Sequence, residues 1–212
     1  MLLVLGVATV LGVIAAINYF SHEARTRRAL TATPVRAIAE VAEGAVVRVQ
    51  GRLRPIHDLI EAPLSGRLCA YYVAVVEERR KSGKSSYWAQ VARDARGVDF
   101  AVEDVSGEIL VRANELEVAI TLDKHTRSGT FDDATEAEQK FLARMNEEST
   151  GLLGFNRTLR YTEGVLEPGE EITVLGLARP GDRHGGGRVL KLGPRPDGPA
   201  LASDDRGIVS RR

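Results

Sequence analysis

The sequence has little cysteine and no surplus of charge of either sign. Cys69 is the single cysteine in 212 residues, so neither an intrachain disulfide nor a zinc site built on several cysteines can form. The 29 basic and 29 acidic side chains give a net charge of zero. Nucleic-acid-binding proteins present a basic surplus on at least one face, so we expect no nucleic-acid partner.

A recognisable catalytic set is also missing. The four histidines, at positions 22, 57, 125 and 184, follow no ordering motif. Cys69 would serve as the nucleophile of a thiol-dependent enzyme only beside a histidine, and a free cysteine among apolar neighbours is more often a small buried hydrophobe. The adjacent acids Glu77 and Glu78 point to opposite faces of a strand and form no acid/base pair. We expect no catalytic residue, no cofactor and no metal.

Two short motifs resemble ligand sites but are incomplete. Gly83-Lys84-Ser85 is similar to the end of a phosphate-binding loop, but Glu78 stands where the first glycine belongs, and the motif joins two strands. His57-Asp58 would hold a metal only with further ligands that the sequence does not reveal. Both motifs are interpreted as polar loop segments.

The first twenty residues carry no charged side chain. As a helix they would span roughly 30 Å, the thickness of the hydrocarbon core of a bilayer. The alternatives are a cleaved signal peptide, which would begin with basic residues and have a shorter apolar run, and a buried helix of a soluble protein. We predict an uncleaved transmembrane anchor, with Tyr19 and Phe20 at the membrane interface.

A basic segment follows the apolar run. It contains Arg25, Arg27, Arg28 and Arg36 against the single acid Glu23. The positive-inside rule therefore places the C-terminal side in the cytoplasm, as a single-pass protein of the cell membrane. The alternative is contact of these arginines with lipid headgroups without an orienting role. Either reading places Arg25, Arg27 and Arg28 at the membrane interface.

Most of the remaining chain has the alternating pattern of strands. The strongest signal is 67–78, which is apolar on both faces and is predicted to be a central strand. Other predicted strands are 46–53, 87–93, a hairpin at 100–111, a hairpin of 159–166 with 171–178, and 188–192. Helical spacing predicts a short helix at 34–43 and an inserted helix at 134–148, whereas 121–133 is predicted to be a loop.

One pattern occurs twice. Residues 43–55 read E-G-x-x-V-x-V-x-G-x-x-R-P, and residues 168–180, 125 positions later, read P-G-x-x-I-x-V-x-G-x-x-R-P. In both copies a turn glycine leads into a strand, and a second glycine permits a bulge or a close backbone crossing. The repeat predicts two barrel-like halves or one barrel whose opening and closing strands correspond, and coincidence is the third interpretation.

Residues 151–155 read Gly-Leu-Leu-Gly-Phe, which is apolar where a solvated loop is usually polar. Leu152, Leu153 and Phe155 suit contact with lipid or with a partner protein beside a bilayer. The alternative is a connector that packs against the barrel.

Three blocks together resemble the GIDE/mulan domain. They are A-P-L-S-G-R-L-C-A-Y-Y-V-A-V-V-E-E at 62–78, F-A-V-E-D-V-S-G-E-I-L-V at 100–111 and R-Y-T-E-G-V-L-E-P-G-E-E-I-T-V-L-G-L-A-R-P at 160–180. This "beside a membrane" (BAM) domain belongs to a membrane E3 ubiquitin ligase of mitochondria and also occurs in bacteria and archaea. The resemblance implies a bacterial or archaeal member: a β-rich binding or sensing module next to a membrane.

The ligases of this family also carry a second transmembrane helix and a RING domain, whose zinc ligands one cysteine cannot supply. Their domain faces the space between the two mitochondrial membranes, whereas the arginines of this chain indicate the cytoplasm.

The expected fold is mainly β: a β-barrel of the OB-like type with one inserted α-helix, plus an N-terminal transmembrane α-helix. The expected parts are an anchor (1–20), a basic juxtamembrane segment with a short helix (21–43), a β-rich domain (44–193) and a disordered tail (194–212). The expected function is a membrane-anchored, non-catalytic binding or sensing module. Its expected partners are the lipid bilayer and another membrane or membrane-proximal protein. The alternatives are a component of a ubiquitin-like E3 ligase system and a thiol-dependent enzyme using Cys69.

Overall fold

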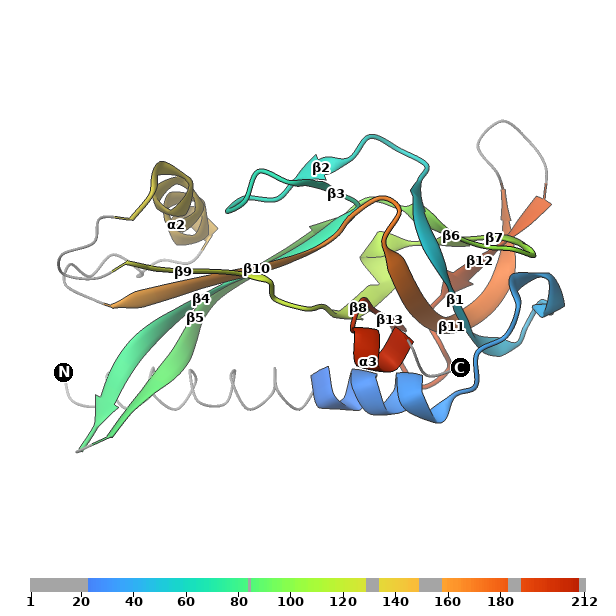
Figure 1. Cartoon of the computed structure of the whole chain (residues 1–212), viewed down its shortest axis with the longest axis horizontal. Coiled ribbons are helices and arrows are strands. Elements are labelled where there is room, and N and C mark those ends of the chain that lie inside the picture. Colours follow the sequence, from blue (N-terminus) through green and yellow to red (C-terminus); the bar gives the residue numbers. More distant parts are fainter. Residues whose placement is uncertain (1–22, 84, 129–133, 149–157, 183–187, 210–212) are drawn as a thin grey trace.

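The computed structural model describes residues 23–83, 85–128, 134–148, 158–182 and 188–209, and these residues form mainly strands (Figure 1). Five strands make a barrel in the order β1-β6-β7-β12-β11, closed by the pairing of β11 with β1. β7 and β12 run parallel, and the other contacts of the barrel are antiparallel. The barrel strands are β1 (Val46–Pro55), β6 (Phe100–Asp104), β7 (Gly107–Val111), β11 (Glu171–Asp182) and β12 (Arg188–Gly193). The prediction of a mainly β protein with a barrel is confirmed.

A second, four-stranded sheet extends to the left of the barrel in Figure 1, in the order β5-β4-β10-β9. The helix α2 (Glu136–Glu148) packs on this sheet and corresponds to the inserted helix predicted at 134–148. The strands are β4 (Tyr71–Ser82), β5 (Ser85–Gly97), β9 (Lys124–Ser128) and β10 (Leu159–Leu166). A short pair, β2 (Ile60–Glu61) with β3 (Leu68–Cys69), precedes β4.

β4 separates two hydrophobic cores. Because side chains alternate between the faces of a strand, Tyr71, Val73 and Val75 enter the barrel core. On the other face, Tyr72, Ala74 and Val76 pack under α2. The prediction of a central strand that is apolar on both faces is confirmed.

Two local predictions before α2 are wrong. The expected helix at 34–43 is reduced to the 3₁₀ turn η1 (Ile38–Glu40), since Val35 is held extended by a bridge to Arg48. The expected loop at 121–133 contains β9, which pairs with β10 although its sequence is polar. A polar edge strand lacks the apolar alternation that identifies strands, so backbone pairing decided its structure.

Two predictions in the C-terminal half are also wrong. β10 and β11 do not form a hairpin, because β10 pairs with β4 whereas β11 pairs with β1. Much of the segment 194–212, predicted to be a disordered tail, is ordered. β13 (Ala200–Ser203) is buried between β11 and β8 (Leu116–Ala119), and α3 (Arg206–Val209) follows. The short apolar runs around Leu201 and Ile208 were sufficient for burial despite the surrounding Pro, Gly and Asp.

Residues 23–32 form a helix that lies against the barrel (Figure 1, blue). Its Leu30 is fully buried in a cluster with Leu175, Leu201 and Ile208. Thr26 Oγ1 donates a hydrogen bond of 2.8 Å to a Glu117 carboxylate oxygen. Among the described residues, none of the helices has both the length and the apolar character of a membrane span. The predicted anchor at 1–20 lies outside these residues.

The two copies of the sequence repeat form one antiparallel pair of strands, the pair that closes the wall of the barrel. Val49 of β1 lies opposite Val174 of β11, and these residues occupy the same position in the two copies. Equivalent hydrogen bonds close both ends of the pair: Gly44 N–H to Ala178 O and Gly169 N–H to Leu53 O, both 2.8 Å. A pseudo-twofold axis therefore passes between Val49 and Val174. The two copies build one barrel, as one interpretation of the repeat proposed.

Candidate functional site

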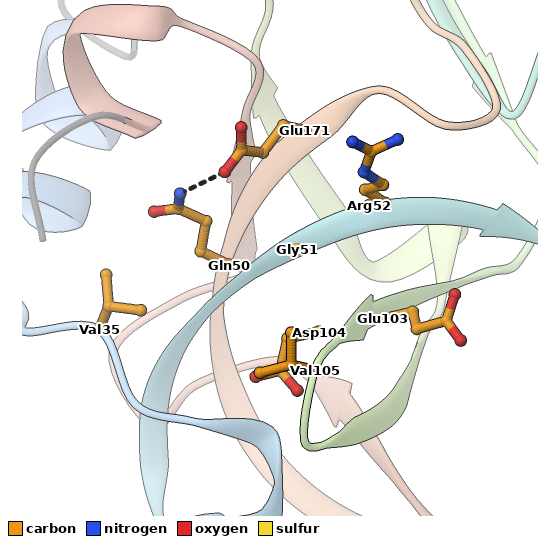
Figure 2. Close-up of a pocket in the computed structure, with 8 residues that line it drawn as sticks. All are labelled: Val35, Gln50, Gly51, Arg52, Glu103, Asp104, Val105 and Glu171. Atoms are coloured by element: carbon orange, nitrogen blue, oxygen red, sulfur yellow. Dashed lines mark hydrogen bonds between the residues drawn. The ribbon is translucent and has the colours of Figure 1, made fainter.

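A hollow of about 630 Å³ opens beside β1 on the outside of the barrel (Figure 2). It lies between the segment that carries Val35 and the turn that joins β6 to β7. The lining combines an exposed stretch of strand with acidic and basic side chains. These residues are Val35, Gln50, Gly51, Arg52, Glu103, Asp104, Val105 and Glu171.

The direction of the β1 backbone groups follows from its bonds to β11. Leu53 N–H donates to Glu170 O at 2.8 Å, and Ala45 O accepts from Ala178 N–H at 2.9 Å. Backbone groups of successive residues alternate between the two edges of an antiparallel strand, so the even-numbered residues point away from β11. The N–H and C=O of Gln50 therefore point toward the hollow.

Pairing along this outer edge of β1 is interrupted at Gln50. On one side, Arg36 N–H donates to Arg48 O at 2.8 Å. On the other side, β6 begins to pair where Arg52 lies opposite Glu103. Between these two contacts no described residue pairs with this edge of β1, which borders the hollow. An open strand edge is a template for backbone hydrogen bonds with another segment.

The Gln50 side chain is only half satisfied. Its amide Nε2 donates to a Glu171 carboxylate oxygen at 2.8 Å, the contact drawn in Figure 2. Its carbonyl Oε1 is buried and accepts no hydrogen bond from the described residues. Buried polar atoms are normally paired, so Oε1 is an exception beside the hollow.

The turn on the far side of the hollow is held by Asp104. Its carboxylate accepts hydrogen bonds from Ser106 N–H at 2.7 Å, Gly107 N–H at 3.0 Å and Ile38 N–H at 2.9 Å. Burial raises the pKa of Asp104, but the bonds from Ser106 and from these N–H groups outweigh it, and the net pKa is lowered. The turn is therefore a fixed wall tied to η1.

Charges on three adjacent strands meet at Arg52. It lies opposite Glu171 of β11 and opposite Glu103 of β6, so the three side chains share the outer face. Glu103 forms an ion pair of 3.1 Å with Arg54. With Asp104, the described residues of the lining supply three carboxylates and one guanidinium.

Cys69 does not lie in this hollow. Its thiol is fully buried and donates to Ile60 O at a sulfur–oxygen distance of 3.5 Å. Burial, followed by the nearby Glu163 carboxylate, raises the pKa of the Cys69 thiol to about 12. The reactive form of a cysteine is the thiolate, so this group is a poor nucleophile at neutral pH.

Of the residues predicted to lie at the membrane interface or to contact a partner, only the three arginines fall within the described part of the chain. Arg27 pairs with Glu23 and with Asp205, which ties the helix of residues 23–32 to the start of α3. Arg28 is exposed, and its Nε donates a hydrogen bond to Ala24 O in the same helix. Arg25 is also exposed. The remaining predicted contacts, Tyr19, Phe20, Leu152, Leu153 and Phe155, lie outside the described residues.

Gly83 and the His57-Asp58 pair lie in connections between strands. Gly83, with a φ of 60°, lies at the tip of the β4–β5 hairpin, where Ser82 pairs with Ser85. His57 and Asp58 are exposed. Within the described ranges, no three His, Cys, Asp or Glu side chains gather as metal ligands would.

The sequence did not single out the hollow, although the repeat contains a signal for it. Gln50 and Leu175 occupy equivalent positions in the two copies. Leu175 is buried under β13 and the helix of residues 23–32, whereas Gln50 borders the hollow. A polar residue where the other copy has an apolar one marks the uncovered edge.

Comparisons with known proteins identify one family. The model of the GIDE family, described as "E3 Ubiquitin ligase", matches residues 73–189, which is more than half of the chain. No curated protein and no solved structure matched. The match covers the second sheet, α2 and four of the five barrel strands at least in part, while β1 precedes it. The family model and the three sequence blocks indicate the same family, and the chain belongs to the GIDE family.

Proposed function

We propose that this protein is a membrane-anchored, non-catalytic binding module in which the hollow beside β1 receives a partner next to the bilayer. Its barrel is of the OB-like type that the sequence suggested, with two long insertions that form the second sheet. The cytoplasmic side of the cell membrane remains its proposed location, because of the arginines after the apolar segment.

The observation that carries this proposal is the attachment of residues 23–32 to the barrel. Arg48 is 2% exposed, and its guanidinium donates to Leu30 O and to Ile208 O, both at 2.8 Å. A cation at the C-terminal end of a helix is favourable for the carbonyls that lack intrahelical partners there. A helix that directly follows the apolar segment is thus fixed to the domain, which suits a module held at a set distance from a membrane.

The thiol-enzyme alternative has little physical support. Cys69 is fully buried, and the high pKa of its thiol keeps it protonated at neutral pH. Among the residues that the structure describes, those lining the hollow include no cysteine or histidine. Its polar groups are suited to recognition.

The ligase-system alternative draws on the family description. In that case the module would bind a chain that supplies a zinc-bound RING. Ubiquitin transfer by the purified full chain with activating and conjugating enzymes alone would contradict the non-catalytic proposal. Transfer that appears only with a co-purified partner would favour the ligase-system alternative.

The anchor is tested by fractionation of cells that express the full chain. We expect it in the membrane pellet after high-salt and alkaline washes, with release by detergent. A chain that is soluble without detergent would overturn the membrane proposal. Carbodiimide cross-linking on native membranes, followed by mass spectrometry, tests whether the hollow contacts a partner protein. We expect cross-links from Glu103 or Glu171 to lysines of that protein.

A further inference from the structure

The hairpin of β4 and β5 extends beyond both hydrophobic cores and keeps one face that α2 does not cover. In Figure 1 the free end of this hairpin reaches the lower side of the molecule, whereas α2 lies at the top. Along β4, Val75 is the last residue in the barrel core and Val76 the last under α2. Because side chains alternate along a strand, Glu77, Arg79 and Lys81 continue the face of Val75, opposite to the one that α2 covers.

Contacts between three strands confirm this arrangement. Arg160 of β10 lies opposite Glu77 and forms an ion pair of 2.6 Å with it. The guanidinium carbon of Arg160 also lies 4.7 Å from the centre of the Trp88 ring of β5. Arg79 lies opposite Trp88 and donates hydrogen bonds of 3.2 Å to the Ser86 hydroxyl. These side chains share one surface, the hairpin face, which consists of Glu77, Arg79, Lys81, Ser86, Trp88 and Arg160.

The charge of this surface is positive. Its acid, Glu77, is neutralised by the ion pair with β10. The neighbouring Glu78 points to the other face of the hairpin, where Arg80 holds its carboxylate at 2.9 Å. Arg79 is exposed with a neutral hydroxyl as its partner, and Lys81 is exposed as well. The acids of the hairpin are thus engaged by other cations, and Arg79 and Lys81 supply its net positive charge.

We propose that the hairpin face binds the anionic headgroups of the membrane in which the protein is anchored. The oxygens of the headgroups accept hydrogen bonds from Arg79 and Lys81, and the half-buried Trp88 ring lies at the level of the headgroups. Basic side chains are attracted to anionic lipids, and tryptophan is enriched where a protein meets the membrane interface. The inference rests on the proposed function, since it names the lipid class that holds the module beside the bilayer.

The position of the hairpin favours a lipid surface over another anionic partner. The helix of residues 23–32 follows the apolar segment and is fixed to the barrel. In Figure 1 this helix and the free end of the hairpin both lie on the lower side of the molecule. Both carry exposed basic side chains, Arg25 and Arg28 on the helix and Arg79 and Lys81 on the hairpin. A membrane surface complements both sets together, whereas the net charge of zero argues against a nucleic acid.

The test uses the fluorescence of Trp88, which is the single tryptophan of the chain and lies on the hairpin face. The full chain is reconstituted in phosphatidylcholine vesicles with or without about 30% phosphatidylserine, and both kinds contain a lipid with a nitroxide on its headgroup. We expect the nitroxide to quench Trp88 at least about twofold more strongly when phosphatidylserine is present. The difference should disappear in about 0.5 M salt, which screens charges over a few ångströms.

Lys81→Glu and Lys140→Glu provide a matched pair of charge reversals. Both lysines are exposed, and Lys140 lies on α2, on the opposite side of the second sheet. Each unit charge near an anionic surface contributes about a fivefold preference, so Lys81→Glu should lower the ratio of bound to unbound hairpin by about 25-fold. Its quenching should then match that in phosphatidylcholine alone. Lys140→Glu should change the ratio by less than about twofold.

Equal quenching in the two kinds of vesicle, or equal quenching of the two variants, would overturn the inference. The fractionation test of the anchor does not depend on lipid charge. If the anchor proposal fails, the full chain is added to preformed vesicles and the two variants are compared there by the same quenching. Failure of the membrane anchor is therefore distinguishable from failure of the contact at the hairpin face.

Discussion

Arg48 and Thr173 occupy equivalent positions in the two copies of the repeat, and Arg48 Nε donates a hydrogen bond of 2.8 Å to Thr173 Oγ1. Thr173 Oγ1 in turn donates to Val49 O at 3.0 Å. One copy thus supplies a buried cation and the other a buried hydroxyl at the same place. The pseudo-twofold pair is symmetric in its backbone and has diverged in its side chains. That divergence fixes the helix of residues 23–32 near one end of β1 and leaves the hollow nearby.

Replacing Arg48 by Met should release that helix. The change removes the donors for Leu30 O and Ile208 O, and buried carbonyls without partners are costly. We expect a loss of about 3–5 kcal/mol in the free energy of unfolding, measured in urea. Limited proteolysis should then cut the chain near residue 30. The exposed Arg28→Ala serves as the control, with a change of about 0.5 kcal/mol or less. Equal effects of the two variants would contradict the attachment of this helix to the barrel through Arg48.

The two strand glycines should differ in their tolerance to alanine. A Cβ at Gly51 would overlap the carbonyl oxygen of Glu103, a backbone atom that can shift only together with β6. At Gly176 the nearest atoms are the Gly193 oxygen and the Leu192 Cβ, both at 3.0 Å. We expect Gly51→Ala to lower the free energy of unfolding by about 3 kcal/mol and Gly176→Ala by about 1 kcal/mol. Thermal or urea unfolding measures both, and the reverse order would refute a close crossing at Gly51.

The parts of the fold predicted from the sequence are those with local signals. β4 carries apolar residues on both faces and α2 has a clear helical spacing, so both were expected near their actual positions. The pairing of β11 with β1, rather than with β10, depends on contacts between residues more than a hundred positions apart. β9 was missed because a polar edge strand is specified by its neighbour. Gln50 was missed because an open strand edge is visible only once the partners of that strand are known.

The buried thiol should make stability fall in alkali. In the folded protein the Cys69 pKa is raised from its ordinary value of 9.0 to about 12, so above pH 9.0 the unfolded state loses this proton first. The free energy of unfolding then decreases by at most about 1.4 kcal/mol per pH unit from this group, from pH 9.0 upward. Cys69→Ala should have a shallower slope over that range in urea unfolding. The difference between the two proteins isolates the thiol, because the tyrosines Tyr71 and Tyr72, whose pKa values are also raised, are common to both. Parallel slopes would show that the thiol is not shielded from water.

Asp94 should control the attachment of α2 without affecting the barrel. Its carboxylate accepts hydrogen bonds from Tyr72 Oη at 2.8 Å and from Arg144 Nη2 of α2 at 2.7 Å. Asp94→Asn removes the negative charge that binds Arg144, and a charge-assisted bond of this kind contributes about 1.5–3 kcal/mol. We expect faster amide hydrogen exchange in α2, with β1 and β11 unchanged.

The exposed ion pair between Glu136 and Lys140 on α2 provides the control, since Glu136→Gln removes one charge from the same helix without touching the sheet. Its exchange pattern should match that of the unmodified protein. If Asp94→Asn instead accelerates exchange throughout the barrel strands, the two cores on either side of β4 unfold together, and α2 is not a separable unit.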